Sequence, residues 1–201
     1  MKARYITAVS GMGRCGSSMV MQMLYCGGMP IDLNKAPWPY VEDARQTTEL
    51  ANQEWVREYY GSALKWLEPT TFLPPMLPFL TIWLDRDPKQ QAKSHVKFNM
   101  ARGRSDVRRQ MNSQSWRRFM EGKKARRPVA LKVWRRRGPL LCLEYEQIKS
   151  KPLLASKAIA EFLGRDLNVE AMATAVRDKE TKCRPDMLEV QLRAEGPPKL
   201  L

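Results

Sequence analysis

A glycine-rich segment near the start of the chain has the composition of an anion-binding turn. The segment GMGRCGSS, residues 11–18, lies between an apolar, β-branched run at 5–10 and helix-forming residues at 17–25, which Gly27 and Gly28 close. Successive backbone N–H groups of such a turn, together with the positive end of the following helix, can hold a phosphate or a sulfonate. A plain glycine-rich turn would have the same residues, but the flanking strand and helix patterns favour a phosphate loop.

The loop has the G-x-x-x-x-G spacing of a Walker A loop but lacks its lysine. Ser17 stands where a P-loop nucleotide triphosphatase places that lysine. Without the ammonium group, hydrolysis of ATP or GTP with Mg²⁺ is disfavoured. Asp85 follows a later apolar run and resembles a Walker B carboxylate, but such a carboxylate works together with the Walker A lysine that is missing here. Arg14 could supply the missing charge from inside the loop, because its planar guanidinium binds phosphate oxygens in pairs.

The loop resembles the 5′-phosphosulfate loop of the sulfotransferase family. That family carries (Lys or Arg)-Ser-Gly-Thr-Thr after its first strand, and residues 14–18 read RCGSS, with Cys15 at the usual serine. The resemblance implies 3′-phosphoadenosine 5′-phosphosulfate (PAPS) as the sulfuryl donor, without a metal ion. It also implies that the donor is bound here by Gly13, Arg14, Cys15, Gly16, Ser17, Ser18 and Met19.

A second anion-binding pair follows the apolar run at 80–84. Arg86 comes just after this run, and Ser94 follows eight residues later, on a helix expected to begin at Pro88 with Asp87 as its N-cap. In the sulfotransferase family an Arg and a Ser at this spacing hold the donor's 3′-phosphate. The resemblance assigns that role to Arg86 and Ser94, and an exposed arginine paired with a neighbouring aspartate is the alternative.

Transfer of the sulfuryl group also requires a positive charge beside the sulfonate and a base for the acceptor's proton. Lys65 resembles in position a family lysine near the transferring group, and Arg14 would stabilise the charge that builds on the leaving oxygen. Glu42, in the segment PWPYVEDAR, is the best candidate for the base, with Asp43 and Glu49 behind it. A surface carboxylate paired with a nearby cation would explain Glu42 equally well.

Two further residues complete the expected site. His95 is the only histidine in the chain and directly follows Ser94. Because adjacent helical residues point about 100° apart, we expect His95 to face away from the donor pocket. Near the C-terminus, Arg184 and Lys182 resemble the basic residues that sulfotransferases often place over the 3′-phosphate, although an exposed basic tail is the ordinary explanation.

Strand patterns alternate with helix patterns along the chain. Strands are expected at 5–10, 63–67, 80–84 and 140–145, and helices at 17–25, within 42–60, from Pro88, at 107–124 and at 152–163. The run at 129–137 is ambiguous and could be a further strand. The alternation predicts one α/β domain, 1–201, with a three-layer, P-loop NTPase-like architecture in which helices flank a mostly parallel sheet, and ligands bind at the carboxyl ends of its strands.

The composition predicts a soluble, basic, cytoplasmic protein. Lys and Arg number 35 against 21 Asp and Glu, which gives a formal charge of +14 and an attraction for anions such as nucleic acid, a membrane surface or a phosphorylated small molecule. Four cysteines without CxxC spacing and a single histidine suggest neither a zinc site nor a disulfide framework. No apolar run approaches the roughly 18–20 residues that span a bilayer.

Three functions are compatible with these patterns. The first is a PAPS-dependent sulfotransferase acting on a small-molecule or anionic acceptor through a hydroxyl or amine. The second is a P-loop, kinase-like protein that binds a nucleotide without transferring sulfate. The third is a basic nucleic-acid-binding module in which Trp116 and Trp134, set among arginines, offer stacking faces. The lysine-free loop together with Arg86 and Ser94 favours the first function.

Overall fold

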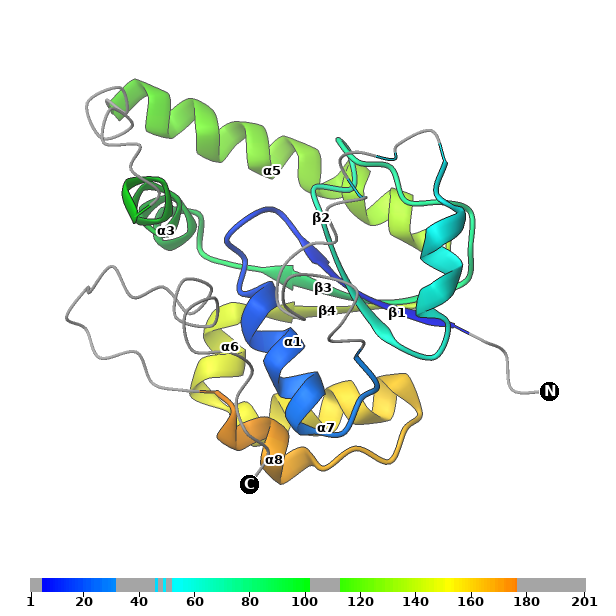
Figure 1. Ribbon diagram of the computed structural model, residues 1–201. Helices are drawn as coiled ribbons and strands as arrows, with labels where there is room; N and C mark the ends of the chain where they lie inside the picture. Colours follow the sequence, from blue (N-terminus) through cyan, green and yellow to red (C-terminus); the bar gives the residue numbers. More distant parts are fainter. Residues whose placement is uncertain (1–4, 32–45, 47–48, 50–51, 102–112, 177–201) are drawn as a thin grey trace.

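The chain forms an α/β structure around a four-stranded parallel sheet, seen in a computed structural model that describes residues 5–31, 46, 49, 52–101 and 113–176 (Figure 1). The strands are β1 (Ile6–Gly11), β2 (Ala63–Leu67), β3 (Phe79–Asp85) and β4 (Leu140–Glu144). Their order is β2-β1-β3-β4, and every neighbouring pair is parallel. In the register of the sheet, Val9 lies opposite Lys65 on one side and Ile82 on the other. This confirms the predicted fold class.

Helices cover both faces of the sheet (Figure 1). The helical elements are α1 (Ser17–Cys26), the 3-10 helix η1 (Glu54–Tyr59), α3 (Pro88–Ala101), α5 (Ser113–Arg135), α6 (Tyr145–Ser150), α7 (Pro152–Leu163) and α8 (Val169–Thr174). Because side chains alternate along a strand, Val9 packs into an apolar cluster with α1, α7 and α8, whereas Ala8 packs into a second cluster with η1 and the end of α5. Parallel strands buried on both faces explain the near-continuous apolar runs in the sequence.

Most of the expected elements are present within a residue or two of their predicted ends. The strand predicted at 63–67 is observed with those bounds. The helix predicted from Pro88 is capped by Asp87, whose Oδ1 accepts a hydrogen bond from the Gln90 N–H at 2.8 Å. At the end of α7, Gly164 adopts the left-handed conformation (φ +58°) that commonly closes a helix.

The segment 113–135 differs from the expectation. The whole segment is one helix, α5. The prediction that 129–137 could be a strand is therefore wrong for residues 129–135, which belong to this helix. Ala130, Leu131 and Trp134 are spaced to lie on one helical face, and all three are buried against the sheet. Pro128 lies inside the helix at an exposed position, where water can satisfy the carbonyl that its missing N–H leaves unpaired.

Trp134 also bears on the nucleic-acid hypothesis. Its side chain is 0% exposed, and its Nε1–H donates to Ser10 Oγ at 2.8 Å. A fully buried indole cannot stack on a base, so the expected role of Trp134 as a stacking face is wrong. In the part of the chain that the structure describes, no helix is long and apolar enough to cross a membrane.

Candidate anion-binding site

The carboxyl ends of the strands gather the candidate residues at one edge of the sheet. Beyond β1 is the loop 12–16, and the first residues after β2, β3 and β4 are Glu68, Arg86 and Tyr145. The chain after β1 enters α1 on one face, whereas the chain after β3 returns through α5 on the other face (Figure 1). In open parallel sheets, ligands bind in the crevice between two such neighbouring strands.

Gly16 and Tyr145 determine the shape of the loop. Gly16 caps α1 with a φ of +103°, and a Cβ atom at this position would collide with the Tyr145 ring. The first turn of α1 closes through a hydrogen bond from the Met19 N–H to the Gly16 carbonyl at 3.0 Å. Arg14 also has a positive φ, +69°, which is uncommon for a residue with a side chain. The loop therefore has a tightly specified conformation.

The N-terminus of α1 is a favourable place for an anion. No acidic residue lies in its first turn, and the aligned peptide dipoles place partial positive charge there. Ser17 and Ser18 begin the helix and are buried. The Lys65 ammonium, 3% exposed, donates to Ser18 Oγ at 3.1 Å. Lys65 on β2 thus brings a buried positive charge to the end of the helix, 47 positions away in the sequence.

The side chain of Cys15 belongs to the apolar core. The side chain is fully buried in the apolar cluster on the α1 side. Burial raises the pKa of the Cys15 thiol, against the lowering effects of a hydrogen bond from the Ser17 N–H and of the Lys65 and Lys123 charges.

Arg86 lies directly against the loop. Its Nη1 donates to the Arg14 carbonyl at 3.1 Å, and its guanidinium covers the Tyr145 ring with Cζ 4.1 Å from the ring centroid. The Nε of Arg86 is buried without a hydrogen-bond partner among the described residues. The Arg14 guanidinium lies over the Phe98 ring at 4.5 Å. The structure therefore brings the two arginines predicted to bind anions to the same edge.

The aspartates beside Arg86 are engaged elsewhere. Asp85 accepts two hydrogen bonds from Arg127 of α5, from Nε at 2.8 Å and from Nη2 at 2.5 Å, and a third from Trp83 Nε1 at 2.9 Å. Asp87 caps α3. Arg86 is therefore not the partner of Asp85 that the alternative interpretation expected. Across the described ranges, no three His, Cys, Asp or Glu side chains converge as a metal site would require.

The remaining predicted residues fall into two groups. Ser94 is half-buried on α3, and within the described structure no hydrogen bond joins it to Arg86. Met19 on α1 packs partly against the apolar core. Glu49 is exposed, and Glu42, Asp43, Lys182 and Arg184 lie outside the described residues.

Two charged residues at the loop were missed by the sequence analysis. The Gly13 N–H donates to Glu68 Oε1 at 2.7 Å, and the Lys123 ammonium donates to the Gly13 carbonyl at 3.0 Å. Lys123 and Glu68 form an ion pair with 3.5 Å between Nζ and Oε1. Glu68 could have been found, because it follows β2 as Arg86 follows β3. Lys123 carries no such signal, since it lies within a run of basic residues.

Gln91 is a third residue that the sequence analysis missed. Its side chain is buried on α3, and its Nε2 donates to the carbonyls of Met12 and Gly13 at 2.9 and 2.8 Å. Together with Lys123, Gln91 satisfies the carbonyl groups on one side of the loop. This leaves α3 and α5 holding the start of the loop, while α1 holds its end.

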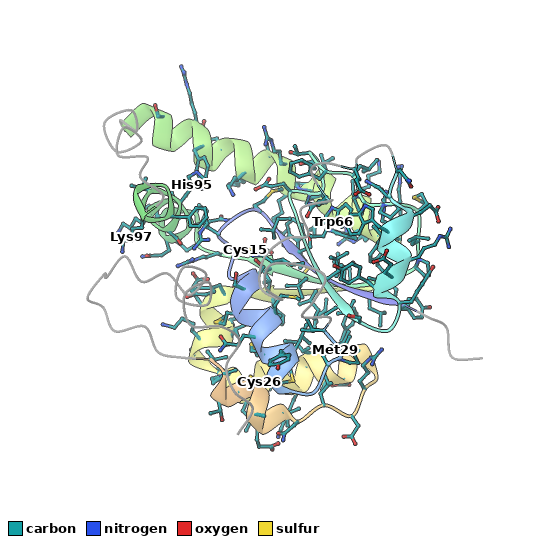
Figure 2. All side chains as sticks on the ribbon, viewed as in Figure 1. Cys15, Cys26, Met29, Trp66, His95 and Lys97 are labelled. Atoms are coloured by element: carbon teal, nitrogen blue, oxygen red, sulfur yellow. The ribbon has the colours of Figure 1, made fainter. Side chains whose placement is uncertain are left out.

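His95 packs against α5 through the ring of Phe119. Figure 2 shows it on the side of α3 that faces α5, with Lys97 on the other side, and its ring is 5.3 Å from that of Phe119. Burial lowers the pKa of His95, the charges of Lys123 and Arg14 lower it further, and Glu68 opposes them. His95 therefore feels the charges around the loop, and whether it faces away from the donor pocket stays a prediction.

Comparisons with known proteins find similarity among solved structures. The chain matches no protein-family model and no curated protein. Among solved structures, it is similar to the crystal structure of mouse sulfotransferase SULT7A1 complexed with PAP, at 18% sequence identity and a TM-score of 0.48. That similarity covers 90% of this chain and 70% of the mouse chain. At this level of similarity, a function has to be inferred from the residues of the site.

Proposed function

We propose that this chain is a sulfotransferase that moves a sulfuryl group from PAPS to a hydroxyl or amine of an acceptor. The observation that carries the proposal is the contact between Arg86 and the phosphate loop, in which Nη1 lies 3.1 Å from the Arg14 carbonyl. A donor with anionic groups at both its 5′ and 3′ positions needs two positive sites close together. The loop with Arg14 and the neighbouring Arg86 meet that need.

The two ends of the donor have separate binding groups. The loop amides, the N-terminus of α1 and Arg14 bind the 5′-phosphosulfate. Arg86 binds the 3′-phosphate, with Ser94 as a neutral donor from α3 and Arg184 as a further cation. Tyr145 supports this role, because its ring holds the Arg86 guanidinium beside the loop.

The reaction is an in-line displacement at sulfur. The acceptor oxygen or nitrogen forms a bond to sulfur as the bond from sulfur to the bridging 5′-phosphate oxygen breaks. That oxygen leaves with its electron pair on adenosine 3′,5′-bisphosphate, and the acceptor's proton passes to a base, for which Glu42 is the candidate. Arg14, Lys65 and the helix N-terminus stabilise the negative charge on the leaving oxygen.

Two features support this donor over ATP with Mg²⁺. Ser17 replaces the lysine that contacts the transferring phosphate in nucleotide triphosphatases. Asp85, at the place of a Walker B carboxylate, is bound through both oxygens to Arg127. A carboxylate neutralised in this way is a poor ligand for a divalent cation.

Ligand-dependent melting tests the proposal. At about 100 times its Kd, adenosine 3′,5′-bisphosphate should add about 2.7 kcal/mol to the stability and raise the Tm by roughly 5–10 °C. ATP with Mg²⁺ at the same concentration should raise it much less. A larger shift with ATP and Mg²⁺ would overturn the assignment. A bisphosphate shift without transfer of ³⁵S from labelled PAPS to any of a broad acceptor panel would favour the nucleotide-binding protein without sulfate transfer.

A further inference from the structure

The ion pair between Lys123 and Glu68 occupies the start of the phosphate loop. The two side chains are only 16% and 26% exposed. Glu68 Oε1 accepts from the Gly13 N–H, and Lys123 Nζ donates to the carbonyl of the same residue. Gly13 suits this close approach, since a Cβ atom there would lie 3.3 Å from Glu68 Oε1, tighter than most such contacts. Both charges are therefore part of the loop.

The backbone around Glu68 directs its carboxylate to this position. Glu68 has a positive φ of +51°, and its N–H donates to the Gly11 carbonyl at 3.2 Å. Its own carbonyl accepts from the N–H groups of Thr71 and Phe72 at 2.8 and 2.9 Å. With both main-chain groups bonded, the turn after β2 is well defined, and the side chain extends from it to the loop.

The position of the carboxylate is unusual for a site that must hold an anion. A negative side chain bonded to a loop amide repels an incoming phosphate or sulfonate and competes for the same N–H group. The lysine beside it has the opposite property. Burial lowers the pKa of Lys123, and the Glu68 charge only partly opposes this effect. The positive charge of this largely buried ammonium is thus only partly balanced by Glu68. A ligand with more negative charge than one carboxylate would stabilise it further.

We propose that Lys123 is a donor-binding residue and that Glu68 is its counter-ion in the donor-free protein, where the donor's 5′ anionic group replaces Glu68 on binding. The inference rests on the proposed function, and it names a source for the positive charge that the lysine-free loop lacks. Lys123 comes from α5, 110 positions from Gly13, instead of from the helix that follows the loop. Glu68 then makes donor binding weaker than the loop alone would allow.

Binding measurements on three variants test the inference. Lys123→Met keeps most of the apolar stem and removes the charge, and it should weaken binding of adenosine 3′,5′-bisphosphate by roughly ten- to a hundredfold. Glu68→Gln removes the competing charge and should tighten binding by about threefold or more. Lys124→Met changes the neighbouring lysine, which is exposed, and should leave the affinity unchanged.

A second ligand locates the effect within the donor. Adenosine 3′-phosphate keeps the group assigned to Arg86 and lacks the 5′ anionic group. Lys123→Met should therefore leave its affinity nearly unchanged. Equal losses for the two ligands would mean that Lys123 acts through general charge or through folding, and would overturn the inference.

The outcomes separate this inference from the proposed function. If wild-type protein does not bind the bisphosphate, the proposed function fails and the inference fails with it. If wild-type protein binds it and Lys123→Met binds equally well, only the inference is overturned. Should Lys123→Met fail to fold by circular dichroism, Glu68→Gln decides, because unchanged or weaker binding in that variant contradicts a displaced counter-ion.

Discussion

The two sides of the sheet hold the glycine-rich loop 12–16 in different ways. On the α1 side the packing contacts are apolar, with the Tyr145 ring against Gly16 and the Cys15 thiol inside the core, and the charge of Lys65 reaches only Ser18 at the start of the helix. On the α5 side the contacts are charged or polar, with Lys123 and Gln91 bonded to the Gly13 carbonyl. One side determines the conformation of the loop, and the other balances its charge.

This difference separates two kinds of substitution. Changes on the α1 side that distort the loop should reduce both the stability of the fold and the affinity for the donor, because the same backbone serves both. Changes in buried residues of α5 that do not touch the loop should reduce stability alone. Changes among the charges at the loop should act mainly on affinity, as the Lys123 and Glu68 variants test.

The largest effect is expected at Gly16. Gly16→Ala forces a side chain into a φ of +103° and against the Tyr145 ring. Backbone strain and overpacking each cost roughly 1–3 kcal/mol, so we expect a loss of about 3 kcal/mol in the free energy of unfolding, measured with urea. The affinity for adenosine 3′,5′-bisphosphate should fall with it, by about tenfold or more.

A second glycine provides the control for this substitution. Gly122 lies within α5, and a Cβ atom added there would meet nothing within 4 Å. Gly122→Ala should therefore stabilise the protein by about 0.5–1 kcal/mol through helix propensity. Equal losses at the two positions would show that the α1 side does not specify the loop as described.

A smaller effect, on stability alone, is expected at Trp134. Trp134→Phe removes the hydrogen bond to Ser10 Oγ and leaves a small void in the core, so the free energy of unfolding should fall by about 2 kcal/mol. The affinity for the bisphosphate should stay within about twofold of wild type, because the hydrogen bond of Trp134 goes to Ser10 of β1 and not to the loop. In a double-mutant cycle, Ser10→Ala should cost less in the Trp134→Phe background than in wild type. Additive costs would argue against the bond.

The parts of the molecule that could be predicted from the sequence are those whose structure is determined by residues close together in the chain. The loop at 11–18 shows its glycines, its serines and the start of α1 within eight positions. The start of α3 is similarly local, since Asp87 and Pro88 specify an N-cap and a first helical residue. The buried strands could be found because an apolar run between turns depends little on what packs against it.

The parts that could not be predicted depend on distant residues. Lys123 reaches Gly13 across 110 positions, and Glu68 reaches it across 55. Their roles depend on how α5 crosses the sheet, which local patterns do not encode. The course of α5 itself was obscured by Pro128, because a proline inside an otherwise helical pattern normally marks an end.

His95 is expected to give the smallest effect, and that effect should appear only on acidification. Burial and the charges of Lys123 and Arg14 keep its pKa below the ordinary value of 6.5, so the folded protein holds the ring neutral at a pH where the unfolded chain already protonates it. As the pH falls below 6.5 toward the pKa of the folded state, the unfolded state binds an extra proton and the free energy of unfolding declines. Above pH 6.5 the ring is neutral in both states, so His95 does not make the free energy of unfolding depend on pH. His95→Gln removes this titration, so between about pH 7.5 and about pH 5.5 the variant should lose less free energy of unfolding than wild type. A variant that loses as much as wild type over that interval would place His95 outside the charged side of the loop.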